Sequence, residues 1–186
     1  MLDAGKSANS RDGFSLIEMM LAVLILGGGL LALASAFAEG MILMSTSHYH
    51  QIAKEKASEA IESVTAARDT RTITWAQIRN VNAWTGDPVG GGIFLNGSQP
   101  LRTRGGDGLV NTADDGSVEA ENLPGSDGIL GTSDDVIQPL TAFTREIQIS
   151  NVGASTNLRQ IRVVVTYQVG HLTRTYELVT YISSFA

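Results

Sequence analysis

Six aspartates in the middle of the chain are the residues best placed to bind a metal ion. They belong to two copies of one pattern, Asp-Gly-aliphatic-x-x-Thr-x-Asp-Asp, at residues 107–115 and 127–135. Asp-Gly favours a turn, and the closing Asp pair then brings carboxylates back towards the first aspartate. Hard oxygen ligands on a glycine-rich loop are those that Ca²⁺ prefers. We expect either a calcium site or a solvated acidic loop with two turns, built on Asp107, Asp114, Asp115, Asp127, Asp134 and Asp135.

Other site chemistry has little support in the sequence. The aspartate spacing is not that of an EF-hand, which needs Asp-x-Asp-x-Asp-Gly and a distal Glu. The chain has no cysteine, which excludes disulfides, thiolate metal sites and a cysteine nucleophile. The three histidines stand outside any catalytic pattern, and Gly90-Gly91-Gly92 lacks the Lys-Ser/Thr of a phosphate-binding loop. The sequence therefore predicts a protein that is not an enzyme.

Negative charge is concentrated around the aspartates. Residues 105–138 carry eight acids and no base, whereas the formal net charge of the whole chain is −6, so the remainder has a small positive excess. An acidic chain with only 6% aromatic residues argues against a nucleic-acid partner. Residues 86–131 also hold twelve of the 20 glycines, which predicts a loop outside the core.

Near the N-terminus lies a segment long enough to cross a membrane. Residues 19–38 carry no charge and, as a helix, would extend about 30 Å, the thickness of a bilayer core. Lys6 and Arg11 precede the segment, and the next Lys or Arg is Lys54. The positive-inside rule then places the N-terminus in the cytoplasm and the rest of the chain across the membrane. The alternative is a secretory signal peptide that ends at Ala36-Phe37-Ala38 or at Ala34-Ser35-Ala36.

Glu18 lies at the start of this apolar segment. A carboxylate inside a membrane helix costs about 2.5–3.5 kcal/mol on insertion scales, so such groups usually have a partner. One interpretation is an interfacial acid that the positive end of the helix dipole stabilises. In the other, the chain is cut after Gly13, and the free amine of Phe14 pairs with Glu18 of the same chain or of a neighbouring copy. The second arrangement makes copies of the chain self-complementary.

The residues Gly13-Phe14-Ser15-Leu16-Ile17-Glu18, followed by a long apolar segment, resemble the class III signal of type IV pilins and type II secretion pseudopilins. The resemblance implies that a prepilin peptidase cleaves between Gly13 and Phe14 and N-methylates Phe14. It implies that residues 1–13 are a leader and that Glu18 helps to dock the subunit into a helical filament. Asp12 departs from the family, in which this position is usually neutral or basic.

The resemblance also implies partners and a location. The partners are the prepilin peptidase, other pilin subunits and the inner membrane. The chain would cross the inner membrane once before it enters a pilus or a periplasmic pseudopilus. Without cysteines it lacks the C-terminal disulfide loop of many major pilins, which favours a minor pilin or a pseudopilin. The alternative function is a secreted or membrane-anchored calcium-binding surface protein with an ordinary signal peptide.

The predicted fold is α+β, with a long N-terminal helix packed on a C-terminal antiparallel sheet of three to four strands. Residues 14–38 form the membrane or filament-core helix, and its amphipathic continuation covers 39–70. A glycine-rich acidic loop region follows at 71–142, and the sheet occupies 143–186. Strands are expected at 143–152, 160–169 and 174–182, where apolar residues alternate with polar ones. The expected apolar face of the second half of the helix consists of Ile52, Ala53, Ala57, Ala60, Ile61, Val64 and Ala67.

Overall fold

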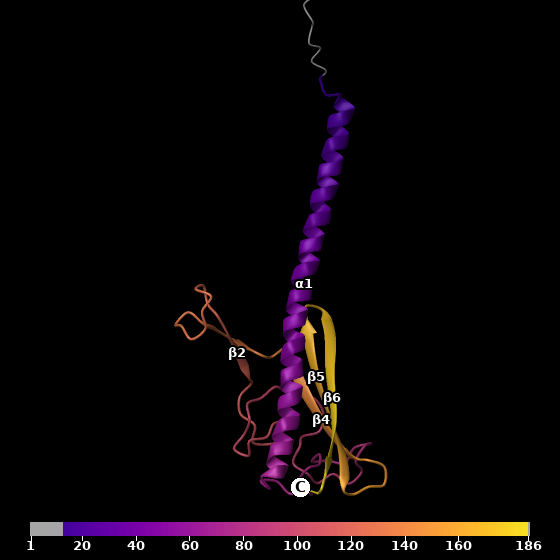
Figure 1. Ribbon diagram of the computed structural model, residues 1–186, viewed down its shortest axis with the longest axis vertical. Coiled ribbons are helices and arrows are strands. Elements are labelled where there is room, and N and C mark those ends of the chain that lie inside the picture. The colour runs from indigo at the N-terminus through magenta and orange to yellow at the C-terminus, as the bar shows by residue number, and fades with distance from the viewer. Residues whose placement is uncertain (1–12, 186) are drawn as a thin grey trace, which may run out of the picture. The chain divides into compact units, whose positions relative to one another are not determined.

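The computed structural model describes residues 13–185 and confirms the α+β fold (Figure 1). One long helix, α1 (Leu16–Asp69), precedes all the strands. The strands are β1 (Gln99–Pro100), β2 (Ala120–Leu123), β3 (Val136–Pro139), β4 (Phe143–Asn151), β5 (Leu158–Val169) and β6 (Leu172–Ser183). The chain divides into two compact units, the first ending at Met44 and the second beginning at Ser45.

In the first unit, α1 is apolar on all sides. Leucine, methionine and alanine are strong helix formers, no proline occurs between Leu16 and Asp69, and the helix continues through the three glycines at 27–29. The large apolar side chains of this half are all more than half exposed. This helix is long and apolar enough to cross a membrane.

In the second unit, α1 packs on the sheet through its predicted apolar face. Ala53, Ala57 and Ala60 are fully buried, and their small side chains allow the helix to approach the sheet closely. The four-stranded sheet has the order β1-β4-β5-β6, and its neighbouring strands are antiparallel. The core-facing side chains of the two central strands alternate with less buried ones, as the sequence predicts. They are Phe143, Arg145, Ile147 and Ile149 on β4, and Ile161, Val163, Val165, Tyr167 and Val169 on β5.

The helix ends in a Schellman motif with an arginine at an unusual position. The Arg71 N–H donates to the Arg68 carbonyl (2.9 Å), and the Thr72 N–H donates to the Ala67 carbonyl (2.9 Å). Arg71 is the residue in the left-handed region, with φ of 58°. Glycine is usual at this position, and a side chain there costs roughly 1–2 kcal/mol. The motif therefore contains a local strain that a glycine would remove.

The expectation that residues 86–131 lie outside the core is wrong for part of this segment. Phe94, Leu101, Leu109 and Val110 are fully buried and belong to the hydrophobic core. Much of the segment is irregular, as predicted. It nevertheless covers one edge of β4, where β1 provides strand pairing for only two residues. The Asn80 amide acts in place of a strand there, because it donates to the Ile147 carbonyl (2.8 Å) and accepts from the Ile149 N–H (2.9 Å).

Candidate functional site

The predicted processing site lies just outside the helix. Gly13, Phe14 and Ser15 are not helical, and the Ser15 carbonyl accepts the first hydrogen bond of α1, from the Met19 N–H (3.1 Å). The Phe14 side chain is 80% exposed, and the space around the Gly13 Cα is open. The peptide bond between Gly13 and Phe14 is therefore accessible in this chain.

Glu18 occupies the first turn of α1, the third position after the N-cap Ser15. An acid at this position interacts favourably with the helix dipole. Its side chain is exposed, and within residues 13–185 its carboxylate forms no hydrogen bond or ion pair with another side chain. Glu18 is also the only charged residue between Phe14 and Ala38. The acid is thus available to a group from outside the chain.

The two aspartate patterns fold in the same way. In each copy, the first of the closing Asp pair accepts hydrogen bonds from the backbone N–H of the opening Asp and from the Thr hydroxyl. The N–H distances are 3.2 Å at Asp114 and 3.3 Å at Asp134, and the hydroxyl distances are 2.8 Å and 2.6 Å. The Thr132 and Ser126 hydroxyls lower the pKa of Asp134 to about 2. The Thr112 hydroxyl, followed by the Asp107 N–H, lowers the pKa of Asp114.

The remaining carboxylates of the patterns repeat as well. The opening Asp accepts from the N–H two residues later, at 2.8 Å in both copies. The last Asp accepts from the N–H four residues earlier, at 2.8 Å for Asp115 and 2.7 Å for Asp135. A glycine precedes each pattern by two residues, Gly105 and Gly125, and a Cβ there would overlap the Asp114 or Asp134 carboxylate. The structural repeat therefore begins two residues before the sequence pattern.

The two copies differ in their surroundings. In the first copy, Leu109 and Val110 are fully buried. Asn111 fixes this copy to β4, because its amide donates to the Arg145 carbonyl (2.9 Å) and accepts from Arg145 Nε (2.8 Å). In the second copy, Gly131 replaces Asn111, and the equivalent apolar pair, Ile129 and Leu130, is 60% exposed. The second copy lies at the tip of the β2–β3 ribbon.

Calcium binding by these aspartates stays a prediction. Within residues 13–185, no three His, Asp or Glu side chains are grouped in a way that could hold a metal ion. Each closing Asp pair instead accepts hydrogen bonds from backbone N–H and threonine hydroxyl groups. A bound cation would need some of these oxygens, so it would have to replace hydrogen bonds that the turns already form.

Sequence reasoning missed a group of partly buried charges between α1 and the loop region. Lys56 forms ion pairs with Glu119 and with Glu59 (2.9 Å), and Glu59 also pairs with Arg104 (3.0 Å). Burial disfavours the charged form of Lys56, but the hydrogen bonds to Glu119 and Glu59 outweigh it and raise the Lys56 pKa. Arg145 lies nearby, and burial lowers its pKa. No motif marks this group, because its members are far apart in the sequence.

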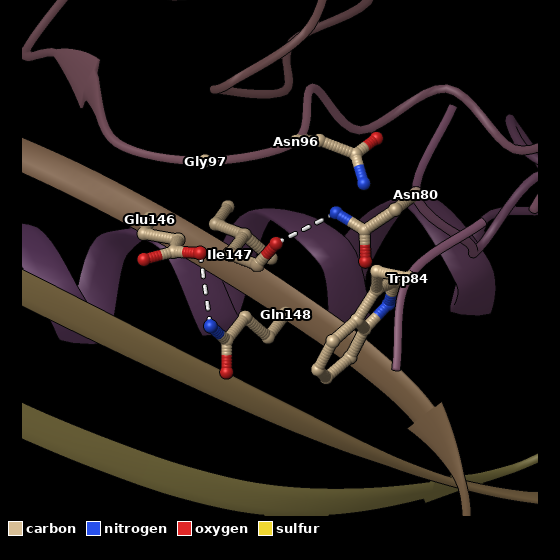
Figure 2. Close-up of a pocket in the computed structure, with 7 residues that line it drawn as sticks. All are labelled: Asn80, Trp84, Asn96, Gly97, Glu146, Ile147 and Gln148. Atoms are coloured by element: carbon tan, nitrogen blue, oxygen red, sulfur yellow. Dashed lines mark hydrogen bonds between the residues drawn. The ribbon is translucent and has the colours of Figure 1, made fainter. Parts of the chain in front are cut away.

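A cavity of about 220 Å³ lies beside β4, and its polar groups are mostly used within the chain (Figure 2). The Asn80 amide reaches the Ile147 carbonyl, and the Gln148 amide donates to Glu146 (2.9 Å). The Trp84 indole N–H donates to the Ile149 carbonyl (3.2 Å). These contacts fix the loop region to β4, and they give the cavity a structural role.

No protein-family model, curated protein or solved structure matches this chain. The resemblance to pilins and pseudopilins thus depends on residues 13–18 and on the apolar segment that follows them.

Proposed function

We propose that this chain is a structural subunit, a minor pilin or a pseudopilin, of a type IV pilus or a type II secretion pseudopilus. In this proposal a prepilin peptidase removes residues 1–13 and methylates Phe14. The chain first resides in the inner membrane with its N-terminus in the cytoplasm. Its N-terminal helix then packs against the helices of other subunits in the filament core, while the second unit faces outward.

One observation carries the proposal: α1 is a single helix whose two halves have different surfaces. The first half is apolar on every side and has no residue buried in the candidate membrane window, whereas the second half buries an alanine-rich face on the sheet. A helix that is apolar all round needs lipid or other helices as its surroundings. A filament subunit uses both in turn, since it leaves the bilayer and then packs with identical helices.

Glu18 supports an assembly role because a lone acid needs a partner in apolar surroundings. It has no side-chain partner within residues 13–185, and the bond to be cut, between Gly13 and Phe14, is exposed. After cleavage, the Phe14 amine carries a positive charge at the same end of the helix. The amine of one copy can then pair with Glu18 of another, which offsets the cost of placing that acid in an apolar filament core.

Mass spectrometry of the mature N-terminus tests the proposal directly. The full chain is isolated from the membranes of cells that contain a prepilin peptidase, and the N-terminal peptide is sequenced. We expect N-methylated Phe14 as the first residue. A chain that begins at Phe37 or Glu39 would contradict the proposal and support a secreted protein with an ordinary signal peptide.

Two matched substitutions on α1 test the role of Glu18. We expect Glu18→Gln to leave membrane insertion intact and to abolish incorporation into sheared filaments, because the amine of the neighbouring copy loses its partner. Glu39→Gln is the control, since Glu39 is also an exposed acid on α1. Incorporation of the Glu18 variant at the level of the control would show that this acid has no part in assembly.

A further inference from the structure

The β2–β3 ribbon carries an apolar tip that stays exposed within residues 13–185, the part of the chain that the structure describes. We call residues 120–139 the arm, which consists of β2, the second aspartate turn and β3. All four residues of β3 are exposed, and Ile129 and Leu130 at the tip are each 60% exposed. In Figure 1 the arm extends away from α1 on the side marked β2. Exposed aliphatic pairs of this kind mark contact surfaces more often than scattered single residues do.

The first aspartate turn shows how this pattern uses its aliphatic pair. Its Leu109 and Val110 are fully buried in the body of the second unit. The same hydrogen bonds form in both turns, whether the pair is buried or exposed. The turn therefore has its shape before contact with a partner, which lowers the entropic cost of binding. The arm thus presents a preformed copy of an element that packs into a protein interior elsewhere in the chain.

A pocket of about 310 Å³ at the end of α1 has the complementary character. It is lined by Arg68, Arg71, Ile73, Thr74, Trp75 and Ser184. Ile73 is only 7% exposed and belongs to the core, so the apolar surface comes from the partly buried Trp75, whose ring also carries the Arg159 guanidinium at 4.1 Å. The two arginines that line the pocket provide positive charge. Arg68 already pairs with Asp69 (2.7 Å), whereas the Arg71 guanidinium is exposed and forms no hydrogen bond or ion pair within residues 13–185.

Arg71 also occupies the left-handed position of the Schellman motif, with φ of 58°. Glycine would fit there without strain, so this backbone position gains nothing from an arginine. Strained positions of this kind are concentrated at functional sites, where the side chain has a use of its own. The guanidinium at the edge of the pocket is such a side chain.

The arm and the pocket are built from different segments of the second unit. β2 is joined to α1 near His48, through the pair formed by His48 and Glu121 (3.0 Å), whereas the pocket includes Arg68. These two helix positions are twenty residues apart, which is about 30 Å along the helix axis. A contact between the arm tip and this pocket therefore joins two copies of the chain. Such a head-to-tail contact leaves each assembly with one open arm at one end and one open pocket at the other, so further copies can add to it as an open chain.

We propose that the arm tip of one copy docks into the Arg68–Arg71–Trp75 pocket of the next copy. Ile129 and Leu130 would cover the exposed part of Trp75, and the tip aspartates, which include Asp127 and Asp134, would face Arg71. The proposal rests on the pilus or pseudopilus function proposed above, and it specifies a contact between the outward-facing units that is additional to the packing of the helices. Its basis is the match in both polarity and charge between two surfaces of one chain.

Cysteine cross-linking in membranes tests the contact, because the natural chain has no cysteine. The full-length chain carries Leu130→Cys at the arm tip and Thr74→Cys in the pocket, and it is oxidised and run on a non-reducing gel. We expect a ladder of dimers, trimers and longer species. Each single variant should stay free of the ladder, since a head-to-tail contact brings Leu130 next to Thr74 and never next to another Leu130. The control pairs Leu130→Cys with Thr173→Cys, an exposed position on β6.

Arg71→Gly, added to the cross-linking variant, separates docking from folding. We expect the ladder to fall about tenfold, the size of change that loss of one charged contact produces, while the melting temperature stays equal or rises. Arg174→Gln, at an exposed position on β6, should leave the ladder unchanged. Absence of the ladder, an equal ladder in the Thr173 control, or no effect of Arg71→Gly would each overturn the docking proposal.

The N-terminus of the chain is sequenced on the same samples, which separates the two proposals. A chain that is not cleaved before Phe14 argues against the pilus function, whereas a cleaved chain without the ladder argues against the arm contact alone.

Discussion

Because the two aspartate turns share one geometry but differ in burial, equivalent substitutions in them should have unequal effects. Leu109→Ala removes a side chain that is fully buried, and such changes destabilise by about 2–5 kcal/mol because a cavity adds to the lost burial. Ile129 is 60% exposed, so at most two-fifths of its burial energy is available. Full burial of such a side chain contributes about 1.5–3 kcal/mol, which limits the cost of Ile129→Ala to roughly 0.6–1.2 kcal/mol.

The assay is guanidinium unfolding of the full chain in detergent micelles, followed by tryptophan fluorescence. Both tryptophans, Trp75 and Trp84, lie in the second unit, so the signal reports that unit and not the apolar half of α1. We expect Leu109→Ala to lower the midpoint clearly, whereas Ile129→Ala stays close to the natural chain. Equal losses from the two substitutions would refute the burial of the first turn and the exposure of the second, and with them the case for the arm as a contact surface.

Two further predictions concern the aspartate turns. If the turns bind calcium, Ca²⁺ at about a hundred times its dissociation constant should stabilise the second unit by about 2.7 kcal/mol in the same assay. A chelator should reverse this stabilisation. A midpoint that Ca²⁺ leaves unchanged would show that the turns do not bind calcium. Thr132→Val should raise the pKa of Asp134 from about 2 towards its ordinary value of 3.8, as measured by NMR of the side-chain carboxyl group. Because the folded-state pKa is the lower one, the turn should gain stability from Asp134 above about pH 4 and lose it as the pH falls to about 2; an unchanged pKa in the variant would show that the hydroxyl is not its cause.

The regular elements could be predicted from the sequence because their residue patterns match their periods. The strands expected at 143–152, 160–169 and 174–182 correspond to β4, β5 and β6. The alternation in β4 and β5 is strict, since one face of each strand packs on the core. The helix could also be predicted from the sequence, because the segment contains no proline and its second half repeats apolar residues every three or four positions.

The loop region could not be predicted in this way, because its structure depends on contacts between distant residues. Asn80 pairs with the backbone of β4 through its side chain, some 67 residues further along the chain. Asn111 bonds Arg145 in the same manner. An asparagine in a glycine-rich segment normally indicates a turn, and no local pattern shows that its amide will replace a strand. The sequence therefore predicts a loop outside the core for a segment in which Leu101, Leu109 and Val110 are buried.

The two turns show the same limit within a single pattern. The sequence predicts their repeated geometry, because Asp, Gly and Thr form the bonds within eleven residues of chain. It does not predict which copy is buried, because both carry two aliphatic residues at the same positions. The residue that fixes the first copy to β4 is Asn111, and the second copy has Gly131 at the equivalent position. This difference does not reveal the burial of the first copy, because the bonds of Asn111 depend on Arg145 in β4.

The size of the effect at Glu18 distinguishes its two interpretations. As an acid in the first turn of α1, Glu18 stabilises the helix by about 0.3–1 kcal/mol through the dipole. Loss of that contribution would change filament incorporation only a few-fold, since 1.4 kcal/mol corresponds to a factor of ten. A carboxylate that pairs with the amine of a neighbouring chain in apolar surroundings contributes more, because its removal leaves that amine buried without a partner, a cost of about 3–5 kcal/mol. A loss of incorporation greater than a hundredfold in Glu18→Gln therefore requires the pairing between copies, whereas a few-fold loss is explained by the helix dipole alone.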